Sequence, residues 1–410
     1  MHPIPSTTIA PIRTTERHII LDALRGLALL GICLANFPEF SLYTFLDDSV
    51  TSAMPAAGLD RVVRYLQYTL IDGKFYTIFS LLFGIGFSII ISNSMKKRTN
   101  GFRIFYRRMG ILLLIGLLHL MFIWSGDILM LYALLGLLLP LFRNVSNRGL
   151  LITSAVLLAF PIAADAAKEA AGLDPAAPVI RVQQYFCAKY GITHDNFAYW
   201  LRDAGSYANV FQFLVQGAFV RMQEFIDGNR LFKVMGLFLL GFYIGKNRLY
   251  AHLGEHRLLL KHVAAYGFAI GLPASAVYAW SAVNGLPLGL TAHSALYTVG
   301  VFPLGLAYMA ALCLCYLHHQ GSAIFQILAA PGRMALTNYI GQSVLGMIIF
   351  YGIGFGLGAN TGLACVTLMA IGVYLLETAC SYIWLHYCRF GPLEWLWRML
   401  TYGKKLPLLK

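Results

Sequence analysis

Long uninterrupted apolar runs are the feature of this sequence that most restricts its fold. A helix needs about 20 apolar residues in a row to cross a bilayer, and the chain contains about ten runs near this length. Hydrocarbon offers no hydrogen-bonding partners, so a spanning chain must pair its backbone groups within helices or a closed barrel. A barrel would instead show alternating segments of about 10 residues. We therefore predict an all-α fold, a polytopic transmembrane helical bundle. The predicted spans are 18–38, 74–94, 109–125, 127–143, 149–165, 231–247, 261–282, 292–317, 334–357 and 361–386.

The composition agrees with a surface that faces lipid. Hydrophobic residues make up 58% of the 410 residues and charged residues only 12%, whereas soluble domains carry about 25% charged residues. The 7 cysteines show no paired spacing, so we expect neither a disulfide framework nor a metal site. The first apolar run follows a polar lead without a clear cleavage site, which favours a retained first helix over a signal peptide.

The basic residues are concentrated in alternate loops. The connections 283–291 and 358–360 carry none, whereas the segments on the other side of the predicted membrane are rich in them. Because loops rich in Lys and Arg stay in the cytoplasm, both termini are predicted to be cytoplasmic. Because the basic residues lie beside apolar segments, we attribute the net charge of +13 to contact with the lipid bilayer. We therefore predict that the protein does not bind nucleic acid. The first basic loop contains Lys96, Lys97, Arg98, Arg103, Arg107 and Arg108.

We divide the chain into four parts. Residues 1–165 hold the first five predicted spans, and residues 231–387 hold the last five. Residues 166–230 form an extracytoplasmic amphipathic segment, because dense aromatic residues alternate with charges, as in helices at an interface. This segment is either a cap packed on the bundle or a lid that binds substrate. Residues 388–410 form a cytoplasmic interfacial tail, in which Gly391-Pro392 begins a surface helix.

Polar side chains in the first predicted span are costly in lipid, so they are candidate functional residues. Asp22 and Arg25 lie three residues apart, on one face of the helix, where they can neutralise each other. Asn36 lies near the outer end of the same span. The pairing is either a structural feature of the helix end or part of a binding site.

His119 and Asp127 flank a tight turn between the third and fourth predicted spans. Together with Asn36, and with Lys74 at the outer start of the second span, they are candidates to line one polar pocket. In that pocket His119 would act as a general base, held by Asp127, because an imidazole titrates near neutrality. The structural alternatives are a helix N-cap at Asp127 and a core histidine at position 119.

The ninth predicted span begins with Arg333, Thr337 and Asn338 on one helix face. The predicted topology puts them at the inner side, level with Asp22 and Arg25. An inner cluster with surplus positive charge suits a phosphate-bearing ligand. The alternative is that Arg333 reaches to the interface and Thr337 bonds to its own helix.

Five motifs, in order along nearly the whole chain, resemble the YeiB family of bacterial inner-membrane proteins. They are Leu21-Asp22-(x2)-Arg25-Gly26 with Asn36, Phe79 to Gly84, His119 with Trp124 to Leu129, Gly332 to Tyr339, and Gly391 to Trp395. The resemblance implies location in the bacterial inner membrane. It also implies an acyltransferase-like scaffold, since this fold is thought to be related to transmembrane acyltransferases such as heparan-α-glucosaminide N-acetyltransferase. Where those relatives carry a functional histidine, this chain has Asn36 or Asp47, so His119 from another helix is the candidate base.

Two functions remain open. The resemblance favours a membrane-embedded transferase that moves an acyl group from a cytoplasmic donor, such as an acyl-CoA, to an extracytoplasmic small polar acceptor. The alternative is a transporter or binding protein for a small polar or anionic molecule in the same pocket. Relatives of the lysosomal type form dimers, and we predict a homodimer. Gly84 with Gly86, or Gly352 with Gly356, would allow the close helix contact that a dimer needs.

Overall fold

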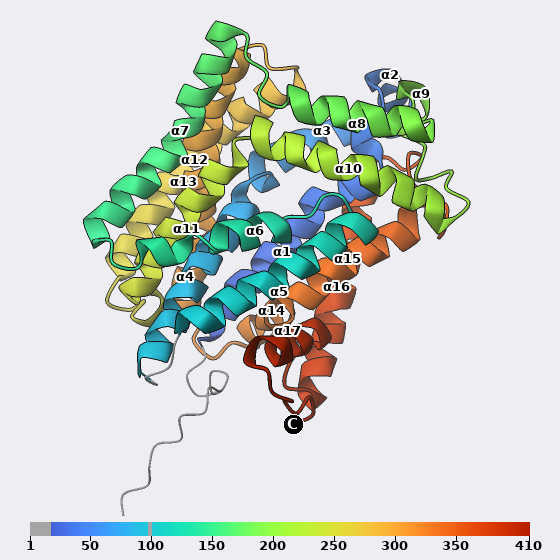
Figure 1. Cartoon of the computed structure of the whole chain (residues 1–410). Helices are drawn as coiled ribbons and strands as arrows, with labels where there is room; N and C mark the ends of the chain where they lie inside the picture. The colour runs from blue at the N-terminus through green and yellow to red at the C-terminus, as the bar shows by residue number, and fades with distance from the viewer. Residues whose placement is uncertain (1–17, 97–100) are drawn as a thin grey trace, which may run out of the picture.

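The computed structural model describes residues 18–96 and 101–410. The regular elements of these residues are helices, apart from one isolated bridge between Cys388 and Leu409, which confirms the all-α prediction (Figure 1). Lys97 and Arg98, two of the basic residues behind the predicted orientation, lie outside the described residues. The helices are α1 (Ile19–Phe40), α2 (Asp48–Ser52), α3 (Ala57–Leu66), α4 (Lys74–Lys96), α5 (Gly101–Phe122), α6 (Leu129–Gly136), α7 (Asn147–Ala171), α8 (Ala177–Tyr190), α9 (His194–Phe197), α10 (Tyr207–Asp227), α11 (Arg230–Lys246), α12 (Arg257–Val283), α13 (Gly289–His318), α14 (Ala323–Arg333), α15 (Ala335–Phe350), α16 (Leu363–Tyr387) and α17 (Pro392–Tyr402).

Within the described residues, 7 helical segments are long and apolar enough to cross a membrane. They are α1, the stretch Ala57–Asn93, α5, α7, α12, α13 and α16. The chain is therefore a helical membrane protein. In the stretch Ala57–Asn93, a π-helix at Gln67–Ile71 and a turn at Asp72 and Gly73 separate α3 from α4. Gly73 has φ +74°, a conformation that glycine adopts without strain.

Three of the ten predicted spans, which correspond to α6, α11 and α15, are not among these seven segments. α6 has 8 residues, α11 has 17 and α15 has 16. α6 is followed by a short 3₁₀-helix, Leu139–Phe142, that contains Pro140, and proline cannot donate the hydrogen bond that would continue a helix. After α15 the chain folds back, with the Phe355 N–H donating to the Ile348 carbonyl at 2.8 Å. The number of spans therefore does not follow from the apolar runs alone.

Small residues bring the helices into backbone contact. A Cβ atom added at Gly26 of α1 would lie 1.8 Å from the Leu328 carbonyl oxygen of α14, and one at Gly332 would lie 1.9 Å from the Asp22 carbonyl oxygen. Close approach through small residues is how helices associate in lipid. Of the glycines predicted to form a dimer contact, Gly84 serves the same purpose within the chain: a Cβ there would lie 2.1 Å from the Phe238 carbonyl oxygen of α11, whereas a Cβ at Gly86 would meet no atom within 4 Å.

The segment 166–230 covers one end of the bundle. α8 and α10 lie side by side across this end, which we call the cap end, while α14 and α17 lie at the opposite end (Figure 1). Two hydrogen bonds join α10 to the end of α5 and the following turn: the Tyr207 hydroxyl donates to the Phe122 carbonyl at 2.6 Å, and the Arg221 Nε donates to the Ser125 carbonyl at 3.0 Å. The segment is therefore packed on the bundle.

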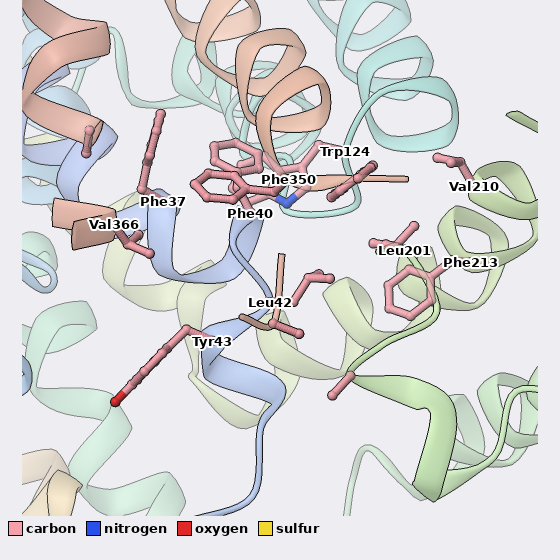
Figure 2. Packing of buried hydrophobic residues seen from close by; sticks show 14 of the residues in the cluster. Phe37, Phe40, Leu42, Tyr43, Trp124, Leu201, Val210, Phe213, Phe350 and Val366 are labelled. Carbon is pink, nitrogen blue, oxygen red and sulfur yellow. The ribbon is translucent and has the colours of Figure 1, made fainter. Parts of the chain in front are cut away.

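A buried cluster of apolar side chains holds the cap on the bundle (Figure 2). Phe37 and Phe40 of α1 contribute to it, and the Phe40 ring lies 4.4 Å from the Trp124 ring, centroid to centroid. Val210 and Phe213 of α10 belong to the same cluster. Burying an aromatic or branched side chain contributes about 1.5–3 kcal/mol to the free energy of folding. This cluster therefore fixes α10 at the cap end of the bundle.

Candidate functional site

A cavity of about 740 Å³ lies in the interior of the bundle. Helices from every part of the chain line it, including α1, α4, α5, α10, α11, α13 and α17. At one end lie Arg25, Arg108 and Trp397, and at the cap end lie charged residues of α1, α7, α10 and α11. We call it the central cavity, and we call its Arg25 and Arg108 end the basic end. It is large enough for a ligand of cofactor size.

Two arginines define the basic end. Arg25 Nη1 lies 2.7 Å from Asp22 Oδ1, so the pairing expected from their spacing is confirmed. The Arg108 guanidinium lies 3.8 Å from the centroid of the Trp397 ring, and the Trp397 indole N–H donates to the Arg108 carbonyl at 3.1 Å. α17 thereby holds the Arg108 side chain against its tryptophan. One arginine has a carboxylate partner and the other is stacked, which leaves net positive charge at this end.

The middle of the central cavity is apolar and aromatic. Among its polar atoms, the Tyr132 hydroxyl lies 2.6 Å from Ser80 Oγ, and it donates to the Tyr76 carbonyl at 3.4 Å. The Tyr76 hydroxyl is buried and has no hydrogen-bond partner among the described residues. A buried hydroxyl without a partner costs about 1–3 kcal/mol, so a ligand that supplies a partner gains from it. The apolar lining residues are Phe75, Phe79, Leu82, Phe83, Phe87, Ile90, Phe105, Met109 and Leu112.

One ionic network at the cap end joins α1 to α10 and α11. Arg221 is 5% exposed and forms a short ion pair with Glu224. Its other guanidinium nitrogen lies 3.8 Å from Glu39 Oε1. Arg230 Nη2 lies 3.5 Å from Glu224 Oε2. All four side chains line the central cavity, and each has a partner of opposite charge.

A second group at the cap end is built from α11, α12 and α13 around Asp72. The Tyr278 hydroxyl donates to Asp72 Oδ2 at 2.7 Å, and the Tyr278 ring lies 4.6 Å from the ring of His293. The Lys233 ammonium lies 3.9 Å from the centroid of the Tyr297 ring. These five side chains all line the central cavity, and we call this group the cap-end chamber.

Of the residues expected at a site, Arg25 and Asn36 line the central cavity. Asp22 is 3% exposed and is the partner of Arg25. Lys74 is fully buried, and its ammonium donates to the Tyr68 carbonyl at 2.7 Å. Lys74 therefore holds the backbone at Tyr68. It is not among the residues that line the central cavity.

His119 and Asp127 do meet, as expected, but behind the cavity wall. His119 Nδ1 lies 2.9 Å from Asp127 Oδ1, and His119 Nε2 lies 2.9 Å from Ser343 Oγ of α15. Asp127 Oδ2 also accepts the Met130 N–H at 2.7 Å, as an N-terminal helix cap does. The three side chains are at most 1% exposed. The order Asp, His, Ser resembles a hydrolase triad, yet here it ties α5, α6 and α15 together.

The remaining predicted residues serve as ties between helices at the opposite end from the cap. The Thr337 hydroxyl donates to Glu394 Oε2 of α17 at 2.6 Å, and Asn338 Nδ2 donates to Ser381 Oγ of α16 at 2.9 Å. Burial raises the pKa of Glu394, while the hydrogen bonds from Thr337 act in the opposite direction. Arg333 ends α14 and does not line the central cavity. Of the inner cluster predicted for a phosphate, Arg25 alone faces this cavity.

Several lining residues were not predicted as site residues. Arg108 precedes the apolar run 109–125 by one position, and Lys233 lies near the start of the run 231–247. An ionisable residue within such a run is a signal of function, and Lys233 could have been found in this way. His293, within the predicted run 292–317, gave the same signal. Asp72 gave no comparable signal, because it lies in a turn before a helix, where charge is common. Within the described part of the chain, no group of His, Cys, Asp and Glu is arranged to hold a metal ion.

Comparison with known proteins places the chain in a family. The family model described as "Protein of unknown function (DUF418)" matches residues 244–404. A relative named "Uncharacterized 39.9 kDa protein in amylase 3'region", from Bacillus acidopullulyticus, is 30% identical over 97% of this chain and 98% of its own length. YxaH of Bacillus subtilis (strain 168), also named uncharacterized, is 29% identical over 98% of this chain and 99% of its own.

A third relative bears the name of the family suggested by the motifs. The uncharacterized protein YeiB of Escherichia coli (strain K12) is 28% identical over 94% of this chain and 96% of its own length. These matches cover both the α1 to α7 half and the C-terminal half, so the cavity-lining helices fall within the shared region. The chain therefore belongs to the DUF418 family of YeiB-like proteins.

Proposed function

We propose that this protein binds an elongated, phosphate-bearing ligand such as an acyl-CoA in the central cavity and transfers its acyl group to a small polar acceptor at the cap end. The supporting observation is that one cavity joins two arginines at one end to a charged chamber at the other. Arginine is well suited to phosphate, because its guanidinium donates two parallel hydrogen bonds. The aromatic middle of the cavity suits a thin, largely apolar arm.

The orientation in the membrane is part of the proposal. The basic end faces the cytoplasm of a bacterium, where acyl-CoA is made, and the cap end faces outward. The segments at the basic end carry the dense Lys and Arg residues, which is the arrangement that the positive-inside rule requires. Both termini are then cytoplasmic, and the protein acts in the inner membrane. We also propose a homodimer, formed by surfaces other than Gly84, which contacts α11.

The reaction would be an ordinary acyl transfer. A hydroxyl or amine of the acceptor attacks the thioester carbonyl carbon, a new C–O or C–N bond forms, and the C–S bond breaks. The acceptor loses one proton and the departing thiolate gains one. Asn36 can donate from its amide to the carbonyl oxygen. Among the lining residues, Asp72 and His293 can accept the proton, and they replace His119 in this proposal because His119 does not reach the cavity.

A carrier is the second candidate, and one observation favours it. The histidine expected to be the base is sequestered behind the wall, with both ring nitrogens hydrogen-bonded. A protein that only binds and releases a ligand needs the cavity and its charges but no base. Transfer and carriage differ in one product: only transfer releases free CoA.

The binding step is tested on the purified full-length protein by thermal shift with a panel of acyl-CoA thioesters. The variant is Arg108→Gln, and the control is Arg107→Gln, which removes the same charge from an exposed neighbour on α5. We expect acyl-CoA to stabilise the wild type and the control, and Arg108→Gln to lose about tenfold or more in affinity. If no thioester stabilises the wild type, or if both variants respond equally, the binding site is elsewhere.

The transfer step is tested by mass spectrometry for free CoA after incubation with small polar acceptors. Release that depends on an acceptor supports transfer. Acyl-CoA binding without release in proteoliposomes, together with movement of a ligand across the membrane, supports the carrier instead.

A further inference from the structure

We propose that the cap-end chamber binds a small zwitterion, with its carboxylate or phosphate at Lys233 and its ammonium at Asp72. This deepens the proposed function, on which it rests, because it names the chemical class of the small polar molecule. The inference comes from two opposite charges that line one chamber and that have no ion-pair partner among the described residues.

Lys233 is the cation of the chamber. The residue is 8% exposed and its side chain lines the central cavity. Its ammonium lies 3.9 Å from the centroid of the Tyr297 ring. Among the described residues, no carboxylate oxygen lies within ion-pair distance of it. A ring face compensates only part of the hydration that a buried ammonium loses, and the three N–H groups remain available to an acidic ligand.

The carboxylates near Lys233 already have other partners. Asp165 Oδ1 accepts from Lys168 Nζ at 2.9 Å and from Asn229 Nδ2 at 2.8 Å, and its second oxygen accepts a short hydrogen bond from Ser294. Glu224 is paired with Arg221 and Arg230. The positive charge of Lys233 is therefore the one that the chamber leaves for a ligand.

Asp72 is the matching anion. One of its oxygens accepts the Tyr278 hydroxyl at 2.7 Å, and in the described part of the chain no Lys, Arg or His nitrogen lies within ion-pair distance of it. Among the described residues, no hydrogen bond to its second oxygen is formed, so this oxygen can accept from an ammonium. The Tyr278 and Tyr297 rings, whose centroids lie 5.5 Å apart, connect the two charged groups. Tyr278 donates to Asp72, and the Lys233 ammonium lies over the Tyr297 ring.

The other charges of the cavity explain why a simple anion fits less well. Glu39 and Glu224 are paired with Arg221 and Arg230, and Asp165 is paired with Lys168. A ligand with only negative charge could therefore bind Lys233 but would leave the charge of Asp72 uncompensated. A molecule that carries both signs meets a charge of opposite sign at each end. Asp227 is exposed, so the chamber reaches the surface of the protein, from which a small molecule can enter.

The test uses the purified full-length protein and a series of ω-amino acids of increasing length, from glycine to 6-aminohexanoate, with phosphoethanolamine. Each is compared with two analogues of the same length, one without the amine and one without the acid. Binding is measured by thermal shift and by calorimetry. We expect at least one zwitterion to bind about tenfold or more tightly than either of its analogues. Equal binding of the three would overturn the proposal.

Two variants test the assignment of each charge. Lys233→Met should abolish the preference for the acidic group and leave a plain amine bound, and Asp72→Asn should do the opposite. The matched controls are Lys246→Met, at the other end of α11, and Asp195→Asn, on the exposed α9. Because Lys233→Met removes a buried charge that has no carboxylate partner, the unliganded melting temperature should stay level or rise. A lower melting temperature with unchanged binding would make Lys233 a structural residue and refute the site.

Two further measurements distinguish a lipid headgroup from a soluble zwitterion as the ligand, and this inference from the proposed function. Reconstitution with phosphatidylethanolamine, compared with phosphatidylglycerol, shows whether a lipid headgroup competes with the soluble zwitterion. Acyl-CoA binding is measured on Lys233→Met in parallel. If the zwitterion fails while acyl-CoA still binds through Arg108, only this inference falls. If acyl-CoA fails as well, the proposed function falls with it.

Discussion

His119 Nδ1 and Asp127 Oδ1 lie 2.9 Å apart across the turn between α5 and α6, and neither side chain is more than 1% exposed. The pair is sealed from the central cavity by neighbours such as Tyr339, whose ring lies 5.3 Å from the His119 ring. A buried carboxylate that accepts two hydrogen bonds contributes to stability through both. We therefore expect this pair to act on the fold and not on a ligand.

Asp127→Asn should lower the free energy of unfolding by about 1–3 kcal/mol, because the amide offers a donor where the carboxylate accepted hydrogen bonds from His119 and Met130. Ser343→Ala, which removes the partner of the other ring nitrogen, should cost less. Acyl-CoA affinity should stay unchanged in both. Melting temperature and affinity are measured together; loss of free-CoA release at an unchanged melting temperature would instead make His119 catalytic.

Tyr76→Phe and Tyr132→Phe remove one hydroxyl each from the cavity wall and should behave differently. The Tyr76 hydroxyl has no partner in the described residues, so its removal should not lower the melting temperature but should weaken ligand binding. The Tyr132 hydroxyl is bonded to Ser80, so its removal should cost about 1 kcal/mol of stability. A marked loss of stability in Tyr76→Phe would show that its hydroxyl is bonded within the protein.

Glu394→Gln should loosen the attachment of α17 to α15. The Glu394 carboxylate accepts the N–H of Leu336 at 2.7 Å and the N–H and hydroxyl of Thr337 at 3.1 and 2.6 Å. Replacing one of its oxygens with an amide should cost about 1–2 kcal/mol. Since α17 also carries Trp397, acyl-CoA affinity should fall moderately. Limited proteolysis of the C-terminal segment reports the loosening, and protection equal to wild type would contradict it.

The orientation can be tested by thiol labelling with an impermeant reagent on intact cells. Asp195→Cys, on the exposed α9, should react from outside, and Lys405→Cys should react only after the membrane is opened. Labelling of Asp195→Cys from the cytoplasmic side alone would reverse the proposed orientation. The natural Cys187 is a poor reporter, because burial raises the pKa of its thiol.

Cys187 itself should show a pH-dependent reaction. The thiolate is the reactive form, and a raised pKa means that less of it is present at neutral pH. Its labelling rate should therefore keep rising with pH beyond the range in which the exposed cysteine of Asp195→Cys levels off. Equal pH profiles for the two thiols would show that Cys187 is fully accessible. As a control, the measurement is repeated in a protein in which the other six cysteines are replaced.

Features that depend on neighbours along the chain could be predicted from the amino-acid sequence. Apolar runs predict membrane helices because backbone groups must be satisfied within the segment. The pairing of Asp22 with Arg25 follows from their three-residue spacing, and Gly391-Pro392 correctly marks the start of α17. Helix ends such as those of α6 and α15 were less predictable, since a proline and a chain reversal shorten runs that are apolar throughout.

Which helix faces meet could not be predicted from the sequence, because it depends on contacts between residues far apart in the chain. His119 bonds to Ser343, 224 residues away, and Arg108 stacks on Trp397, 289 residues away. Helical periodicity places a side chain on a face, but the packing of several helices decides whether that face borders a neighbour or the central cavity. That is why Lys74 became a buried tie to the Tyr68 carbonyl, while Lys233, another lysine at the cap end, points into the chamber.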